Sequence, residues 1–304
     1  MKWRSNSVRR ARPLLGTIVE IQVAGLGERE CHAAIETAFA TVEEVQQRMS
    51  FHEPTSTLSR LNRLAALAPM RVDAWTWDVL RFAEKVHRVS GGLFDVTIAP
   101  VLQAQGFLPA GESDLPGTKQ AAPSFADVQF LPDRMIRFHH PGVRIDLGGI
   151  AKGFAVDQAV ATLCEAGVPR GLVNAGGDLR AFGEEPFPVV IRHPDAPSMA
   201  LAEIDLCEAA LATSAHYFAE RQVPGAAFAP IIHPTSGQTA RAVRTATVRA
   251  ATAMAADALT KVVMLAGEAA LPILEQFDAD AIFVAEGGQA MCSPGFHATL
   301  ELSA

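Results

Sequence analysis

Hydrophobic and polar positions recur along this chain at two spacings, one typical of strands and one typical of helices. Over residues 15–23, every second side chain from Leu15 to Val23 falls on one face, which predicts a strand. Over residues 28–49 the apolar positions follow helical spacing, which predicts an amphipathic helix. The same spacing predicts a second helix over residues 75–89, with Asp73 as its N-cap.

The second half of the chain mixes short strands with helices. Residues 109–125 are rich in Pro, Gly, Ser and Asp, which is typical of a long surface loop or a linker. Helices are predicted over residues 150–166 and 255–266, and strands over residues 135–138, 143–147, 171–174, 188–192, 245–250 and 281–285. Because these elements are interspersed rather than strictly alternating, we expect an α/β fold with mixed α+β sheets, as a single unit over residues 1–304.

Composition and charge narrow the protein class. Of the 304 residues, 49% are hydrophobic and 19% are charged, a balance that disfavours disorder and coiled coils. No apolar run is long enough for a membrane span, so we expect a soluble protein. The net charge of −7 argues against general nucleic-acid binding. A solvated terminus explains the basic cluster near the start better than a nucleic-acid arm does; it comprises Lys2, Arg4, Arg9, Arg10 and Arg12.

Cysteine usage and the first apolar stretch favour a cytoplasmic protein. The four cysteines are scattered and form no Cys-X-X-Cys pair, which is typical of free thiols in a reducing compartment. Residues 13–23 contain Glu20 and Gln22, and no small-residue cleavage site follows them. This stretch therefore does not match a secretory signal.

The first candidate site is a glycine turn at residues 145–153. A predicted strand ends there, Gly148 and Gly149 turn the chain, and a predicted helix begins. Backbone amides at such a turn and the free N–H groups of a new helix favour a phosphate group. Lys152 would add a cation and Asp146 a polar contact to a sugar or base. A tight turn with a solvated Lys152 explains the same residues equally well, because the spacing matches no phosphate-loop motif.

A second glycine pair repeats this pattern at residues 173–178. A predicted strand runs into Gly176 and Gly177, and the carboxylate of Asp178 follows. On local evidence alone, a hairpin turn with a capping Asp is the simpler interpretation.

Two further segments carry groups that suit catalysis. In residues 231–237, His233 stands in a loop beside a proline and two hydroxyl residues, where it is either a general base or merely exposed. Asp257 lies near the start of a predicted helix and shares a face with Thr260 and Lys261. A carboxylate and a hydroxyl placed this way suit Mg²⁺, whereas an ordinary Asp257–Lys261 helix pair is the simpler alternative.

These segments occur in an order that resembles the FAD:protein FMN transferases, the ApbE-like flavin transferase family. The resemblance extends over nearly the whole chain, and its matching pieces are residues 15–17, 49–50, 56–62, 92–100, 146–153, 173–178, 212–214, 231–237 and 256–259.

The resemblance implies a T-fold-like architecture with FAD bound in a cleft. It implies Mg²⁺ on the pyrophosphate, transfer of FMN to a Thr or Ser hydroxyl of an acceptor flavoprotein, and release of AMP. The expected catalytic residues are His233 and Asp257, and the expected metal site combines Gly149, Asp257 and Thr260. FAD contacts are expected from Leu15, His52, Phe94, Asp95, Asp146, Lys152, Gly176, Gly177, Asp178 and His233.

Two departures from the family pattern fall on the expected reaction centre. The family commonly has Thr four residues after the metal-binding Asp, but here Lys261 stands at that position and the Thr is Thr260. An ammonium group is no metal ligand; paired with Asp257, it would stand where the charge of the ion would be. In the loop at residues 230–234, Pro230 replaces the usual His, and His233 replaces the usual Asp.

Flavin binding is therefore better supported by the sequence than transfer. Two alternatives to an active Mg²⁺-dependent transferase stay open. One is a family member that binds FAD as a carrier, store or regulatory module without transferring it, and the other is an FAD pyrophosphatase that produces FMN and AMP.

Overall fold

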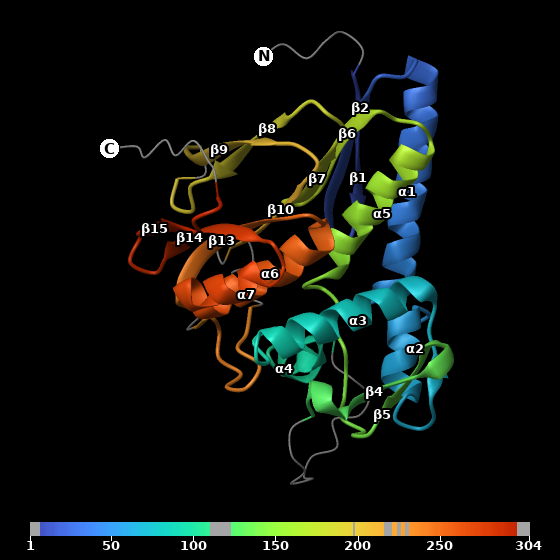
Figure 1. Cartoon of the computed structure of the whole chain (residues 1–304). Helices are drawn as coiled ribbons and strands as arrows, with labels where there is room; N and C mark the ends of the chain where they lie inside the picture. The colour runs from blue at the N-terminus through green and yellow to red at the C-terminus, as the bar shows by residue number, and fades with distance from the viewer. Residues whose placement is uncertain are drawn as a thin grey trace.

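An antiparallel sheet of eight strands organises the part of the chain that the structure describes, which is residues 7–109, 123–196, 198–215, 221–223, 226–228 and 231–296. The structure is a computed structural model, and Figure 1 shows its elements. The strand order is β1-β2-β6-β7-β10-β13-β14-β15. Their bounds are β1 (Ser7–Leu14), β2 (Thr17–Ala24), β6 (Arg170–Ala175), β7 (Asp178–Phe182), β10 (Ala210–Ala215), β13 (Val243–Ala250), β14 (Asp280–Ala285) and β15 (Ala290–Cys292).

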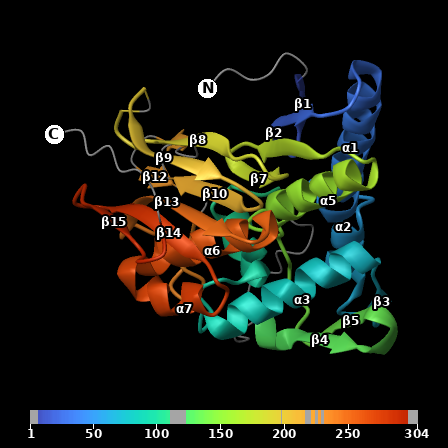
Figure 2. The same cartoon turned by 45° about the horizontal axis from the view of Figure 1, so that its top comes forward.

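Three helices cover one face of this sheet, as Figure 1 and Figure 2 show: α1 (Glu28–Met49), α5 (Ala151–Glu165) and α6 (Ala253–Ala266). Along β2 every second residue is fully buried beneath them, and these residues are Val19, Ile21 and Val23. This alternation follows from the strand period of two, which turns successive side chains to opposite faces. The helices supply the matching apolar stripes, so the main core lies between the two layers.

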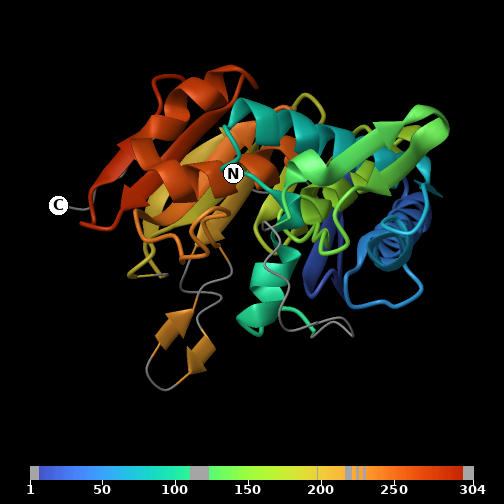
Figure 3. The same ribbon diagram turned by 90° about the horizontal axis from the view of Figure 1, so that it is seen from below.

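The opposite face of the sheet carries a second, smaller core. Residues next to those of the main core in sequence point there, among them Leu211, Ile282 and Val284. A separate hairpin of β8 (Phe187–Arg192) and β9 (Ala200–Leu206) packs on them with Phe187 and Ile204. The two-stranded pair β11 (Arg221–Val223) and β12 (Ala226–Phe228) stands away from the sheet in Figure 3.

A helical region beside the sheet holds the remaining elements that the structure describes, except the two short helices η4 and α7, which follow α6 and lie beside it and β14. Its largest helix is α3 (Ala74–Val89), whose N-cap Asp73 accepts the Thr76 N–H over 3.1 Å. A small sheet in the order β3-β5-β4 lies next to it. The remaining bounds are α2 (Thr57–Leu64), β3 (Met70–Arg71), η1 (Val96–Ile98), α4 (Ala99–Ala104), η2 (Phe125–Asp127), β4 (Val128–Leu131), η3 (Pro132–Arg134), β5 (Met135–Phe138), η4 (Gly267–Ala270) and α7 (Leu271–Glu275).

The four predicted helices are confirmed as α1, α3, α5 and α6, with ends within two residues of the prediction. The mixed α/β class is also confirmed. The strand predicted over residues 143–147 is wrong, because this segment is extended but pairs with no strand among the described residues. Its backbone is satisfied by a side chain instead. Asn62 donates to the Ile145 carbonyl oxygen over 2.9 Å and accepts the Ile145 N–H over 2.8 Å.

Strand β1 has no counterpart in the prediction, which treats the basic residues near the start as a solvated terminus. Arg9 and Arg12 lie on β1 and form ion pairs with Glu20 and Glu36. Lys2, Arg4 and residues 110–122 of the predicted loop lie outside the described residues. None of the helices in the described ranges has the length and apolar character that crossing a membrane requires.

Candidate functional site

The turn at Gly148 and Gly149 leads directly into α5 and places Lys152 in the first turn of that helix. Asp146 fixes the approach to the turn. Its backbone N–H donates to the Val96 carbonyl oxygen over 2.8 Å, and its carboxylate accepts the Gly148 N–H over 3.2 Å. The segment that leads into α5 is thereby held against η1.

Helix α6 begins close against α5, and two devices fix this contact. A Cβ on Gly153 would lie 2.1 Å from the Ala253 carbonyl oxygen, so only glycine permits the approach. The Asp157 carboxylate accepts the N–H groups of Ala253 and Met254 over 2.9 and 2.8 Å, which satisfies free donors at the start of α6. Arg180 on β7 holds the same carboxylate over 2.8 Å. The first turns of the two helices are therefore rigidly placed relative to each other.

Two carboxylates and two ammonium groups meet at this junction. Lys152 Nζ lies 2.6 Å from Asp178 Oδ2 and 3.3 Å from Asp257 Oδ2. Lys261 Nζ pairs with Asp257 Oδ1 and donates to the Asp257 backbone oxygen over 2.9 Å. The Gly153 N–H also donates to Asp257 Oδ2, over 3.2 Å. The Asp257 side chain is completely buried, so its charge depends on these partners.

The titration behaviour of the two carboxyl groups differs because their partners differ. Burial raises the pKa of Asp257, but Lys152 and Lys261 outweigh it and lower the pKa to about 2. Burial and the charge of Asp257 raise the pKa of Asp178 to about 6, although Lys152 partly offsets the shift. Lys152 is the cation paired with Asp178, at 2.6 Å from Asp178 Oδ2. Burial alone would lower the pKa of Lys152, but the two carboxylates outweigh it and raise that pKa.

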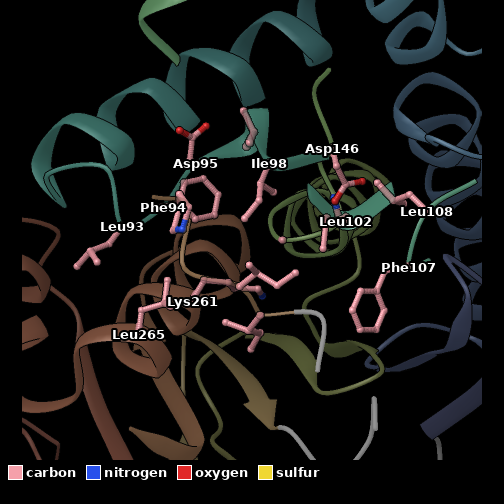
Figure 4. Close-up of a pocket in the computed structure, with 16 residues that line it drawn as sticks. Leu93, Phe94, Asp95, Ile98, Leu102, Phe107, Leu108, Asp146, Lys261 and Leu265 are labelled. Carbon is pink, nitrogen blue, oxygen red and sulfur yellow. The ribbon is translucent and has the colours of Figure 1, made fainter. Parts of the chain in front are cut away.

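A cavity of about 240 Å³ adjoins this charge cluster (Figure 4). Lys261 belongs to both, because its side chain lines the cavity while its ammonium pairs with Asp257. The Gly148-Gly149 turn forms another part of the wall. Most of the remaining lining is apolar and includes Leu93, Phe94, Ile98, Leu102, Phe107, Leu108, Ile231 and Leu265. A mostly apolar hollow with a few polar groups at its edge is typical of a small-molecule site.

Asp95 and Asp146 are the carboxylates among the residues that line the cavity. Asp95 Oδ1 accepts both the N–H and the hydroxyl of Thr97, over 2.7 and 2.6 Å, which caps η1. His87 Nδ1 lies 3.6 Å from Asp95 Oδ2. Burial raises the pKa of Asp146, and the Gly148 N–H, His52 and Lys152 partly offset this increase. Both carboxyl groups are thus fixed in place at the wall of the cavity.

Several residues expected from the resemblance are turn or rim residues. Gly176 and Gly177, both with positive φ, form the tight turn between β6 and β7, so the predicted hairpin is confirmed. The capping residue is Asn174, whose side chain accepts the Gly177 N–H over 2.9 Å, whereas Asp178 is the first residue of β7 and pairs with Lys152. A Cβ on Gly176 would lie 2.4 Å from the Thr17 hydroxyl oxygen, which places this turn against the start of β2. Leu15 lies in the adjacent β1–β2 turn, also with positive φ.

Seven of the expected residues fall into two neighbouring groups. Gly149, Lys152, Asp178 and Asp257 come together at the α5–α6 junction, and Phe94, Asp95 and Asp146 line the cavity beside it. His52 is exposed, although it is close enough to affect the titration of Asp146.

His233 belongs to a loop that contributes Ile231, Ile232 and Pro234 to the cavity wall, but its own side chain is not part of that wall. Its Nδ1 accepts the Thr235 N–H over 3.3 Å. With Nδ1 as an acceptor, the neutral ring carries its proton on Nε2. In this arrangement His233 is a donor at Nε2 rather than a base. Pro230, at the position where the family commonly has His, lies outside the described residues.

The expected Mg²⁺ site is a poor fit to the residues present. Hard cations require oxygen ligands, but the Asp257 carboxylate is already bound by two ammonium groups and one N–H group. The Thr260 hydroxyl donates to the Asp257 backbone oxygen over 2.7 Å and lies 2.7 Å from the Ser214 hydroxyl, completely buried. The described residues contain no group of three or more His, Cys, Asp or Glu side chains able to hold a metal ion.

Sequence reasoning missed the residues that support the site. Asp157 and Asn62 receive no role in it, although each binds two backbone groups. An Asp in the middle of an apolar helix is a detectable signal, because a buried carboxylate needs donors. The apolar wall from α4 gives no such signal, since apolar residues of this kind are equally typical of a core.

Comparison with known proteins identifies the family of this chain independently of the site geometry. The model of the ApbE family matches residues 15–283. An FAD:protein FMN transferase of Vibrio cholerae is 29% identical over 238 residues, which cover 75% of this chain and 71% of the relative. A protein of the same name from Rhodobacter capsulatus is 28% identical over 300 residues, 95% of this chain and 57% of that protein.

Solved structures agree in fold. The crystal structure of the ApbE protein from Thermotoga maritima superposes with a TM-score of 0.84 at 26% identity, over 95% of this chain and 98% of that one. The flavin transferase ApbE from Vibrio cholerae gives a TM-score of 0.83 at 24% identity, with the same coverage.

Proposed function

Because this chain belongs to the ApbE family, we propose that it is an FAD:protein FMN transferase. It binds FAD in the cavity beside Lys261 and transfers the FMN moiety to a Thr or Ser hydroxyl of an acceptor flavoprotein. AMP is the second product. The observation that carries the proposal is the position of Lys261, which lines an apolar cavity and also pairs with Asp257 beside the glycine turn.

The geometry suits a ligand with an aromatic part and a diphosphate. The apolar side chains of the cavity provide surface for a ring system, whereas the polar edge is formed by the Gly148-Gly149 turn and Lys261. An ammonium group has three N–H donors. Two contacts of Lys261 go to the Asp257 carboxylate and carbonyl oxygens, which leaves one donor for a ligand.

The reaction is a phosphoryl transfer at an anhydride. The hydroxyl oxygen of the acceptor forms a bond to the phosphorus of the FMN half, the bond from that phosphorus to the oxygen shared with AMP breaks, and the hydroxyl proton is released. Positioned cations and N–H donors favour this step by offsetting charge on the phosphate oxygens. Lys152 and Lys261 have this role in our proposal. Asp257 holds both cations and, with a pKa of about 2, stays ionised and accepts no proton.

The test uses the whole chain with FAD and an acceptor domain that carries the target Thr or Ser. We expect a covalent flavin on the acceptor, detected as a mass increase and as fluorescence in a denaturing gel, with AMP in equal amount. An acceptor with Ala at the target position is the matched control and should stay unlabelled. Bound FAD without an adduct would indicate a binding protein, and FMN and AMP without an adduct would indicate a pyrophosphatase. No binding of FAD would contradict the flavin assignment itself.

A further inference from the structure

The side chain of Lys261 lies next to two of the residues expected to hold a divalent cation, Gly149 and Asp257. Its ammonium pairs with the Asp257 carboxylate and donates to the Asp257 carbonyl oxygen over 2.9 Å. Its stem runs along the glycine turn, because a Cβ built on Gly149 would lie 3.4 Å from Lys261 Cε and 3.8 Å from Cδ. The Lys261 side chain therefore lies beside Gly149 and binds both the carboxylate and the backbone carbonyl oxygen of Asp257.

The surrounding groups hold Lys261 in this position. Asp257 is completely buried, and 19% of the Lys261 side chain is exposed, so the pair differs from a loose surface pair on a helix. If Lys261 moved away, Lys152 alone would compensate a carboxylate that also faces Asp178. A divalent cation would have to displace one ammonium and approach the other, and both are positively charged.

We propose that the Lys261 ammonium takes the place of the divalent cation in this protein, so that the diphosphate of FAD is held without a metal ion. This inference rests on the proposed function, because it assigns Lys261 a role toward the diphosphate of that substrate. The proposed contact between Lys261 and the diphosphate is ionic and reversible. Lys261 donates one N–H to a phosphate oxygen while Asp257 holds the other two donors, and no bond to Lys261 forms or breaks.

The first experiment measures metal binding and FAD binding separately on the metal-stripped whole chain. Mn²⁺ binding is followed by electron paramagnetic resonance without FAD, and FAD binding by quenching of flavin fluorescence in EDTA or in Mg²⁺. We expect no stoichiometric Mn²⁺ site. We also expect FAD dissociation constants in the two buffers that agree within about twofold. One tight Mn²⁺ per chain, or FAD binding that EDTA weakens by about tenfold or more, would overturn the inference.

Variants at position 261 separate charge from shape. Lys261→Thr removes the ammonium and supplies a hydroxyl, so we expect it to gain a Mn²⁺ site and to bind FAD tightly only in Mg²⁺. Lys261→Met keeps the length of the side chain without its charge, and we expect weaker FAD binding in both buffers, by about tenfold or more. Unchanged FAD binding by Lys261→Met in EDTA would contradict the inference. The matched control is Lys85→Thr on α3, where the lysine lies over the Phe277 ring away from the cavity; it should behave as the unmodified chain.

The outcomes also distinguish the two proposals. A chain that binds no FAD in either buffer contradicts the proposed function, and with it a role of Lys261 toward FAD. In that case the Mn²⁺ titration still decides whether Lys261 excludes an ion, because it needs no flavin.

Discussion

Asn62 is the residue whose replacement tests the architecture of the site most directly. Its side chain makes two buried hydrogen bonds with the backbone of Ile145, and Asp146 at the cavity wall is the next residue. Asn62→Leu keeps a side chain of similar size but removes both bonds. The Ile145 N–H and carbonyl groups then lose their partner in a place where water cannot easily replace it.

The expected loss of stability follows from these two groups. Leaving a buried donor or acceptor unpaired costs about 1–3 kcal/mol each, so Asn62→Leu should lower the free energy of unfolding by about 2–6 kcal/mol. Denaturant unfolding measures this difference. Amide hydrogen exchange should show faster exchange at Ile145 and Asp146, and FAD binding should weaken because Asp146 loses its fixed position.

The control is Arg63→Leu, the next residue on α2, which is exposed and should change the unfolding free energy by less than about 0.5 kcal/mol. An Asn62→Leu protein as stable as this control would refute the reasoning, since it would show that the segment around Ile145 does not depend on the amide. A loss of stability without faster exchange at Ile145 would locate the effect elsewhere.

Three further predictions concern the α5–α6 junction and the loop beside it. Gly153→Ala places a Cβ 2.1 Å from the Ala253 carbonyl oxygen, so we expect a loss of about 3 kcal/mol or more in thermal or denaturant unfolding, whereas Gly287→Ala, with no atom near its Cβ, should be neutral. The pKa of Asp178 is raised to about 6, so the folded chain binds this proton more tightly than the unfolded chain. The stability of the unmodified chain relative to Asp178→Asn should therefore rise as pH falls from about 6 to about 4; a difference that does not vary with pH would contradict it. Because His233 Nδ1 accepts the Thr235 N–H and Nε2 carries the ring proton, we expect His233→Ala to leave kcat within about twofold; a kcat lowered by about tenfold or more would show that His233 takes the acceptor proton.

The fold could be predicted where one periodicity dominates a long segment. Helices α1 and α3 have sustained helical spacing and capping signals, and both are found where the spacing places them. Residues 143–147 show why a short apolar run is ambiguous, because their extended backbone finds its partner in the Asn62 side chain 83 residues away. Strand β1 was missed because its pairing with β2 leaves basic side chains exposed, a pattern that a solvated terminus shares.

The sequence predicts which residues belong to the site better than it predicts the contacts between them. The glycine turns and Asp257 do converge, since Lys152 connects Asp178 after the second turn with Asp257 on α6. The sequence contains no signal for which oxygen each ammonium binds. That depends on the close approach of α5 and α6, which is set by Gly153 and Asp157.

The positions of Thr260 and Lys261 explain why the hydroxyl next to Lys261 does not restore a metal site. Successive residues of an α-helix are turned by about 100°, so a Thr at 260 and a Thr at 261 face different neighbours. Here the Thr260 hydroxyl faces the sheet and lies 2.7 Å from the Ser214 hydroxyl on β10, while position 261 faces the cavity. The residue at position 261 faces the cavity and therefore decides whether a ligand there meets an ammonium group or a metal ion. In this chain that residue is a lysine. A shift of one position along the helix thus changes the hydroxyl from a possible ligand into part of the packing between α6 and the sheet.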